Sequence, residues 1–118
     1  MKSPNVSIYT QAYNTKPFLS CCIESVLNQS FSDFEYILID NGSTDGSKEL
    51  MEQYAQQDSR IRLIRLEENQ PGVWLEIARD SGTGQYLTVL DSDDWWEPNY
   101  LESLIGFLEK DNLDLAVT

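Results

Sequence analysis

Three carboxylates crowd into four residues at Asp91-Ser92-Asp93-Asp94, directly after the apolar run 86–90. Negative charges this close repel one another unless a cation or a cationic ligand shares them. An Asp-x-Asp loop can supply an oxygen ligand to a divalent ion and leave the other positions to water and diphosphate oxygens. Such an ion would also neutralise charge that builds on a leaving diphosphate. The alternative is a solvated acidic loop before a helix that starts near Glu97, and both interpretations stay open at this point.

Two further polar segments follow apolar runs in the same way. Asp40-Asn41-Gly42-Ser43-Thr44-Asp45-Gly46 follows the run 34–39, and its carboxylate and amide could hydrogen-bond a base or a ribose. Tyr13 and Asn14 follow the run 5–10, where a tyrosine ring could stack on a planar base. The same residue types are those that turns and helix caps require. Each segment alone is ambiguous, so its meaning depends on whether the fold brings the three together.

The charge balance of the chain excludes several classes of partner. The 118 residues carry 20 acidic and 8 basic side chains, a net charge of −12. A binder of phosphate backbones needs clustered cations, so we expect no nucleic acid partner, and the same balance argues against an anionic membrane surface.

No apolar run approaches the roughly 20 residues that a membrane span needs, and no basic leader precedes an apolar segment. We therefore expect a cytoplasmic protein without a transmembrane segment.

The absence of histidine narrows the chemistry further. It removes Ser-His-Asp and Cys-His catalysis and any zinc site that uses histidine. Cys21 and Cys22 are adjacent within a helical pattern, and because vicinal cysteines rarely bridge, we expect reduced, partly buried thiols. Any metal should then have oxygen ligands, which favours Mg²⁺ or Mn²⁺ and leaves Ca²⁺ open.

The spacing of apolar residues predicts alternating strands and helices. Strands are expected from residue 5 to near Gln11 and over 34–39, 61–66 and 86–90, with a last strand starting near Leu113. Helices are expected over 16–29, 43–57, 71–79 and 97–110. This order predicts one α/β domain over residues 1–118, with a doubly wound, mostly parallel sheet covered by helices on both faces. Ligands of such sheets bind beyond the carboxyl ends of the strands, so the three polar segments should share one rim.

Taken together, these motifs resemble family 2 glycosyltransferases in composition and in order, over the segments 6–14, 25–35, 39–47, 84–87 and 90–94. The resemblance implies a GT-A fold, a nucleotide-diphosphate sugar donor, Mn²⁺ or Mg²⁺, and transfer to a hydroxyl with inversion at the anomeric carbon. It also implies a saccharide or lipid-linked acceptor, with cell-surface polysaccharide synthesis as the commonest setting. The full-length parent could then lie at the inner face of the membrane.

The resemblance also assigns roles to individual positions. It places Tyr13 beside the base, and Asp40 and Asn41 at the base or its ribose. Asp91 would approach the ribose or a phosphate, with Ser92 beside it in the donor site. Asp93 would be the direct metal ligand, and Asp94 would support the loop.

Three positions depart from the family pattern. Gln11-Ala12 stands where Pro-Thr is usual, and Gln11 becomes a candidate donor contact. Asn41 stands where many members have a second aspartate, and because an amide donates as well as accepts, the preferred base can differ. Arg79 lies in a segment that resembles the family's Ala-Arg-Asn-x-Gly but reaches Gly84 several residues early. It is therefore either a diphosphate contact or a solvated cation at a helix end.

The catalytic base of the family lies well beyond the last strand expected here, so we expect it beyond Thr118 and expect this chain to bind a donor weakly and transfer sugar poorly. A shortened sheet exposes apolar surface, which leaves a homodimer open. The main alternative is a non-catalytic module that binds a nucleotide sugar. Receiver and aspartyl-phosphatase domains are disfavoured, because Lys110 lies at a helix end and Gln11 stands where the phosphatase nucleophile would be.

Overall fold

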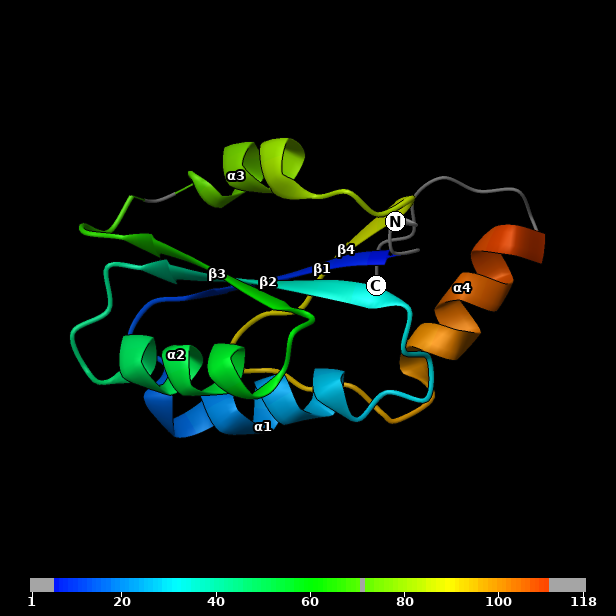
Figure 1. Ribbon diagram of the computed structural model, residues 1–118, viewed down its shortest axis with the longest axis horizontal. Coiled ribbons are helices and arrows are strands. Elements are labelled where there is room, and N and C mark those ends of the chain that lie inside the picture. Colours follow the sequence, from blue (N-terminus) through cyan, green and yellow to red (C-terminus); the bar gives the residue numbers. More distant parts are fainter. Residues whose placement is uncertain (1–5, 71, 111–118) are drawn as a thin grey trace.

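Four strands lie parallel in one sheet, in the order β3-β2-β1-β4 (Figure 1). The computed structural model describes residues 6–70 and 72–110. The strands are β1 (Val6–Ala12), β2 (Phe34–Asn41), β3 (Ile61–Leu66) and β4 (Tyr86–Val89), and the helices are α1 (Lys16–Leu27), α2 (Ser47–Gln57), α3 (Trp74–Ser81) and α4 (Tyr100–Lys110). The last strand expected near Leu113 falls outside these described residues. Over the described ranges, no helix is both long enough and apolar enough to cross a membrane.

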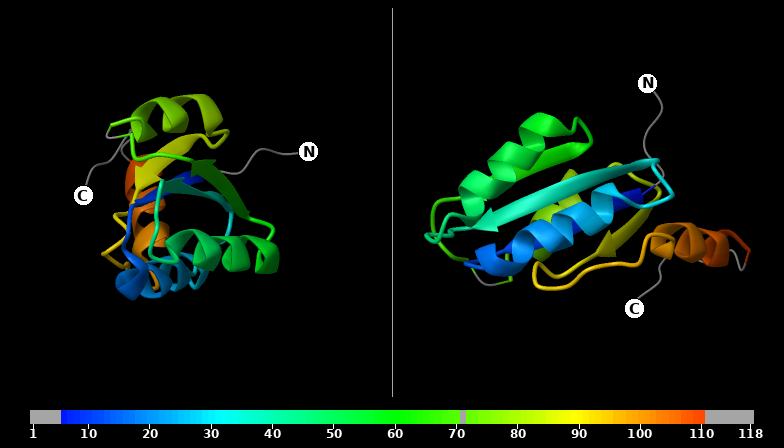
Figure 2. Two further views of the ribbon diagram at one scale, coloured as in Figure 1. Left: turned by 90° about the vertical axis from the view of Figure 1, so that its left-hand side faces the viewer. Right: turned by 90° about the horizontal axis from the view of Figure 1, so that it is seen from below.

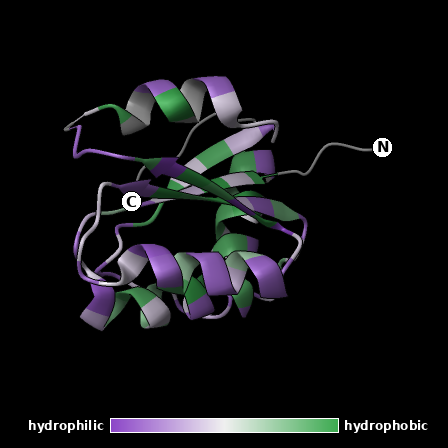
Figure 3. Ribbon diagram, turned by 60° about the vertical axis from the view of Figure 1, so that its left-hand side comes forward, coloured by the Kyte–Doolittle hydropathy of each residue, from purple (hydrophilic) through white to green (hydrophobic). Residues whose placement is uncertain are grey.

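Helices cover both faces of the sheet, which confirms the doubly wound arrangement. α1 and α2 lie on one face, α3 lies on the other, and α4 lies to one side of the sheet (Figures 1 and 2). Figure 3 shows that the helices below the sheet carry many hydrophilic residues, while hydrophobic residues run along the strands. The fold therefore buries apolar side chains of α1 and α2 on one face of the sheet and of α3 on the other, while α4 adds Leu101, Ile105 and Leu108 to the larger core.

Strand alternation decides which side chains face which helix. Ile8 and Ala12 belong to the larger core, which also contains Leu19 and Ile23 of α1. Tyr9 belongs to a smaller core on the other face, with Ile37 and Ile39 of β2 and, packed against them, Ile77 of α3. Every second residue of β1 therefore points toward α3, which sets up the position of Gln11.

The register of the strands brings their carboxyl ends to one rim. Ala12 pairs with Asp40 between β1 and β2, and Asn41 pairs with Leu66 between β2 and β3. Beyond the end of β4, the amide of Leu90 donates to the carbonyl of Tyr9 at 2.9 Å. This bond continues the β1–β4 pairing past Val89 and carries the chain to Asp91 beside the end of β1.

Both strands before the rim are longer than the sequence predicts, and two helices begin later. β1 runs to Ala12 and β2 to Asn41, so Asp40 and Asn41 are strand residues rather than turn residues. α2 begins at Ser47 instead of Ser43, because Gly46 adopts a φ of 99° and Asp45 Oδ1 accepts a hydrogen bond from the Ser47 amide at 3.0 Å. A helix can begin only after that left-handed residue.

α4 begins at Tyr100 instead of near Glu97. The carbonyl of Pro98 accepts a hydrogen bond from the amide of Ser30 at 2.8 Å, and the amide of Tyr100 donates to the Glu97 carbonyl at 3.0 Å. Residues 97–99 therefore form a separate turn that is tied to the end of α1.

Candidate functional site

A pocket of about 130 Å³ opens at the carboxyl ends of β1 and β4. Its lining consists of Tyr9, Gln11, Ile39, Val89 and Asp91. Tyr9 and Gln11 are two residues apart in β1, so they face the same side of the sheet, and Gln11 pairs with Ile39 of β2. The pocket therefore lies on the α3 side of the sheet, and it is lined by Asp91 of the acidic segment and by Gln11, which lies in β1 just before Tyr13 and Asn14.

Gln11 brings an unused hydrogen-bond acceptor to this pocket. Its Oε1 atom is buried and has no hydrogen-bond partner among the described residues. A buried carbonyl oxygen without a partner costs free energy, about 1–3 kcal/mol, that a ligand N–H or O–H could recover. Gln11 is thus equipped to accept a hydrogen bond from a bound molecule.

The acidic segment forms a tight turn at the mouth of this pocket. The amide of Asp94 donates to the carbonyl of Asp91 at 3.0 Å, which places Ser92 and Asp93 at the tip. Ser92 is buried, whereas the aspartates at 91, 93 and 94 are exposed. Within the described part of the chain, the carboxylate of Asp93 makes no hydrogen bond and no ion pair. The turn therefore presents a free carboxylate to solvent beside Asp91.

This donor set fits a divalent ion held mainly by outside ligands. No three side chains among His, Cys, Asp and Glu converge on one point in residues 6–70 and 72–110. A protein cage for a metal is thus absent from that part of the structure, and Asp93 offers a single exposed oxygen ligand. Mg²⁺ and Mn²⁺ accept such sites when water and phosphate oxygens complete the coordination. The residues present fit that arrangement.

Asp40 and Asn41 lie at the same rim but do not line the pocket. Each is 1% exposed. Asp40 shares its sheet position with Ala12, on the α1 and α2 side, and its Oδ1 accepts a hydrogen bond from the amide of Ser43 at 3.1 Å. Asn41 faces the other side and bonds the backbone of Gln70 through both ends of its amide. The two neighbours therefore serve opposite faces of the sheet.

The loops after β1 and β2 are joined by hydrogen bonds. Asn14 has a φ of 54°, and its Oδ1 accepts from the amide of Thr44 at 2.7 Å. The backbone amide of Asn14 donates to Ser43 Oγ at 3.1 Å. Tyr13, just before it, is 45% exposed and stands away from the pocket lining. Asn14 is thus a connecting residue, while the ring of Tyr13 is free to meet a ligand at the rim.

The structure also supplies residues that the sequence did not mark. Tyr9, Ile39 and Val89 form the apolar wall of the pocket. Burial raises the pKa of Tyr9, so its hydroxyl is neutral at pH 7. Alternation along β1 places Tyr9 on the same face as Gln11 and could have identified it. Gln70, by contrast, carried no signal in the sequence. The side chain of Arg79, in α3, lies outside the described parts of the structure.

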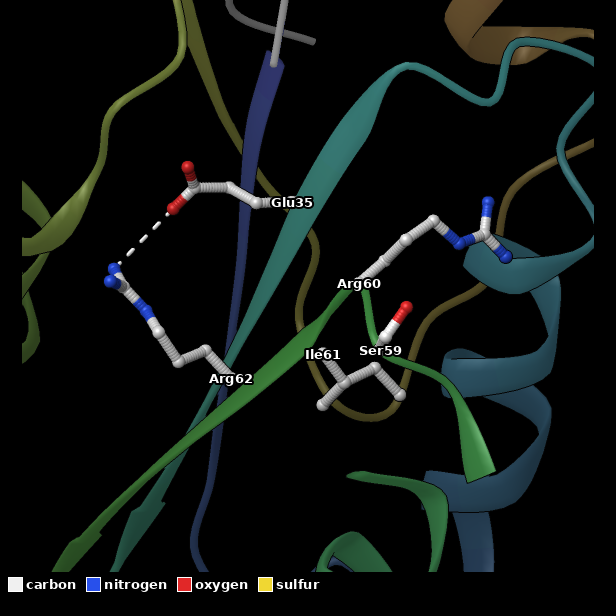
Figure 4. Close-up of a pocket in the computed structure, with 5 residues that line it drawn as sticks. All are labelled: Glu35, Ser59, Arg60, Ile61 and Arg62. Atoms are coloured by element: carbon white, nitrogen blue, oxygen red, sulfur yellow. Dashed lines mark hydrogen bonds and ion pairs between the residues drawn. The ribbon is translucent and has the colours of Figure 1, made fainter. Parts of the chain in front are cut away.

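A larger pocket, of about 210 Å³, lies at the opposite end of the sheet, where β2 and β3 begin. It is lined by Glu35, Ser59, Arg60, Ile61 and Arg62. Figure 4 shows Arg62 turned toward Glu35, at 3.4 Å, while Arg60 points away from them. Arg60 pairs with Asp58 at 2.8 Å. Because both guanidinium groups already have carboxylate partners, this pocket offers little to an anion.

The sequence profile of Glycosyl transferase family 2 matches residues 7–118. The chain belongs to this family. TuaG of Bacillus subtilis, a glycosyltransferase named for teichuronic acid biosynthesis, is 38% identical over 106 residues, which cover 89% of this chain and 42% of that protein. Among the first curated relatives, this chain spans between 16% and 42% of their lengths.

Solved structures share the fold. TarS 1–349 of S. aureus in complex with UDP superposes with a TM-score of 0.83 at 24% identity, over 92% of this chain and 33% of that one. The mannosyltransferase PcManGT of Pyrobaculum calidifontis, in complex with GDP-Man and Mn²⁺, gives a TM-score of 0.81 at 21% identity, over 91% of this chain and 33% of that one. The sheet described above is thus the GT-A fold.

Proposed function

We propose that this chain carries the nucleotide-sugar-binding part of a glycosyltransferase that moves a sugar from a nucleotide-diphosphate donor to a hydroxyl group with inversion. One observation carries the proposal: Gln11 and Asp91 line a single pocket at the carboxyl ends of β1 and β4, and Asp93 stands exposed in the adjoining turn. In parallel α/β sheets this rim is the usual ligand site.

The donor would lie along the rim, with its base toward the loops after β1 and β2. Tyr13 would stack on the base, and Asp40 and Asn41 would stand next to the base or its ribose. Gln11 Oε1 would accept a hydrogen bond from a ligand N–H or O–H in the pocket. Ser92 and Asp91 would border the ribose and the first phosphate, and Arg79 is the candidate partner of the diphosphate. The structures of TarS with UDP and of PcManGT with GDP-Man support this donor class.

Asp93 would hold the divalent ion, Mn²⁺ or Mg²⁺. When bound, such an ion neutralises negative charge on a leaving diphosphate. The chain has a net charge of −12, so the ion also reconciles an acidic rim with an anionic donor. Asp94 would support the turn, since its Oδ1 accepts a hydrogen bond from the amide of Trp95 at 3.0 Å. The Mn²⁺ named with PcManGT supports the choice of metal.

The setting that we propose is synthesis of a cell-surface polysaccharide, with a saccharide or lipid-linked acceptor. The name of TuaG supports this setting. We propose that this synthesis takes place in the cytoplasm.

The proposal is tested by calorimetric titration of UDP, GDP and dTDP into the protein, with Mn²⁺ and again with EDTA. We expect at least one nucleotide to bind in the presence of Mn²⁺ and to lose most of its affinity in EDTA. Binding of the corresponding nucleoside monophosphates serves as the matched control, because they lack the β-phosphate. Absence of binding by all three diphosphates in Mn²⁺ would contradict the proposal.

A further inference from the structure

Three side chains in and just after α1 form hydrogen bonds with the segment that carries the acidic turn. Cys22, Ser25 and Gln29 recur at intervals of three and four residues, at and just beyond the C-terminal half of α1, so they lie on one face of the helix. Each contacts a different point between Asp91 and Leu101. We call these three residues the α1 ladder.

Cys22 holds the first residue of the turn. Its side chain is fully buried, and its Sγ donates to the carbonyl of Asp91 at 3.4 Å. Behind it, Thr10 Oγ1 and the Tyr36 hydroxyl lie 2.7 Å apart, and both are within hydrogen-bonding distance of the sulfur. Burial raises the pKa of the Cys22 thiol to about 11, so the proton needed for donation is present at pH 7.

Ser25 holds the chain just after the turn. Its Oγ accepts a hydrogen bond from the amide of Trp96 at 3.1 Å and donates to the carbonyl of Cys22 at 2.7 Å. This hydroxyl therefore serves as both a hydrogen-bond donor and an acceptor. The turn from Asp91 to Asp94 is thus fixed on its two sides by residues of one helix.

Gln29 secures the far end of the segment. It is 6% exposed, and its Nε2 donates to the carbonyl of Glu97 at 2.6 Å while its Oε1 accepts from the amide of Leu101 at 2.8 Å. Residues 90–99 belong to no strand or helix, so they lack the regular hydrogen bonds of secondary structure. The α1 ladder supplies much of what replaces them.

We propose that Cys22, Ser25 and Gln29 are positioning residues, which hold the acidic turn so that Asp93 meets the metal and diphosphate of a bound donor. This inference rests on the proposed function of the turn. None of the three side chains would touch the donor, because they contact the backbone of the segment from the α1 side, while the pocket opens on the α3 side. Their effect on binding would pass through the orientation of Asp93.

The test compares Cys22→Ala and Ser25→Ala with Cys21→Ala, an adjacent and exposed position on the same helix. The first measurement is hydrogen exchange at the amides of Asp94 and Trp96, which needs no ligand. Loss of one hydrogen bond should speed local exchange roughly two- to tenfold in the two ladder variants. Cys21→Ala should match the wild-type chain. Cys22→Ser, which retains a donor to the Asp91 carbonyl, should restore slow exchange at Asp94.

The second measurement is the affinity for whichever of UDP, GDP and dTDP binds the wild-type chain most tightly, with Mn²⁺ and with EDTA, at a temperature where thermal unfolding shows every variant folded. We expect the ladder variants to weaken the Mn²⁺-dependent affinity about two- to tenfold and to leave the residual affinity in EDTA unchanged. A general loss of stability would instead weaken the affinity equally with Mn²⁺ and with EDTA.

The outcomes separate the two claims. If the wild-type chain binds a nucleotide with Mn²⁺ but the ladder variants bind equally well, the positioning role is wrong and the proposed function stands. If the wild-type chain binds no nucleoside diphosphate, the proposed function fails. Unchanged exchange at Asp94 and Trp96 would overturn the inference in either case.

Discussion

Asn41 and Gln70 join the end of β2 to the chain that follows β3 through a closed pair of hydrogen bonds. Asn41 Nδ2 donates to the backbone carbonyl of Gln70 at 3.3 Å, and the backbone amide of Gln70 donates to Asn41 Oδ1 at 2.7 Å. The side-chain amide thus replaces a missing stretch of sheet pairing. It fixes one wall of the rim at which we propose that the donor binds.

Asn41→Asp should destabilise the protein. An aspartate can still accept from the Gln70 amide, but it has no N–H for the Gln70 carbonyl, and the two oxygens repel. We expect the free energy of unfolding in urea at pH 7 to fall by about 1–3 kcal/mol. Asn69→Asp adds the same charge at an exposed position beside Gln70, and it should change the free energy of unfolding little. Equal stabilities of the two variants would show that the amide pair contributes nothing.

Gly42→Ala should be costly because space and backbone both oppose a side chain. Gly42 has a φ of 78°, and a Cβ there would lie 2.6 Å from the Asn69 nitrogen. We expect a loss of at least about 1–2 kcal/mol in chemical denaturation. Gly106→Ala provides the opposite case, since nothing lies within 4 Å of its added Cβ in α4. Gly106→Ala should raise the free energy of unfolding by roughly 0.5–1 kcal/mol. A decrease similar to that of Gly42→Ala would refute the argument.

Asp45 should contribute to the acid lability of the fold. Hydrogen bonds from the Ser47 hydroxyl and from backbone amides favour its charged form and lower its pKa. A group with a depressed pKa in the folded state stabilises the protein above its unfolded pKa of about 4, and this stability is lost as the pH falls below that value. Asp45→Asn should therefore flatten the change in unfolding free energy between pH 7 and pH 3. A change in unfolding free energy between pH 7 and pH 3 that is as large in Asp45→Asn as in the wild-type chain would contradict this expectation.

The two cysteines should differ sharply in reactivity. The thiolate is the reactive form, and burial raises the pKa of the Cys22 thiol to about 11, while Cys21 is exposed. Brief iodoacetamide treatment of the native protein at pH 8 should label Cys21 and spare Cys22, as read by peptide mass spectrometry. Labelling of both should appear only in denaturant. Comparable labelling of Cys22 in the native protein would show that its site opens readily.

Periodicity predicted the order of elements and the parallel sheet, because β2 and β4 are apolar runs, β1 and β3 alternate apolar with polar residues, and each helix has an apolar stripe. It placed the starts of α2 and α4 too early. At α2, Ser43, Thr44 and Asp45 all suit a helix cap, but the residue before the helix is none of them: it is Gly46, in a left-handed conformation. Local sequence does not decide between such neighbours.

Only part of the candidate site could be predicted from the sequence. The pattern marked Gln11 and Asp91, which the pocket joins, and it marked Asn41, whose bonds to Gln70 it could not reveal. Gln29 and Ser25 stood within a recognised motif, but their partners lie about 70 residues away in the chain. Such contacts follow from the packing of α1 beside the segment after β4, which spacing alone does not encode.

Asp93 is the residue on which the proposed chemistry depends most directly. The decisive measurement therefore takes whichever of UDP, GDP and dTDP binds the wild-type chain most tightly and compares its binding by the wild-type chain, Asp93→Asn and Asp94→Asn over a range of Mn²⁺ concentrations. The substitutions remove the same charge at adjacent exposed positions. The account predicts that Asp93→Asn abolishes the Mn²⁺-dependent part of the affinity, while Asp94→Asn retains most of it. Mn²⁺-dependent binding that survives in Asp93→Asn would contradict the assignment of this turn as the metal site.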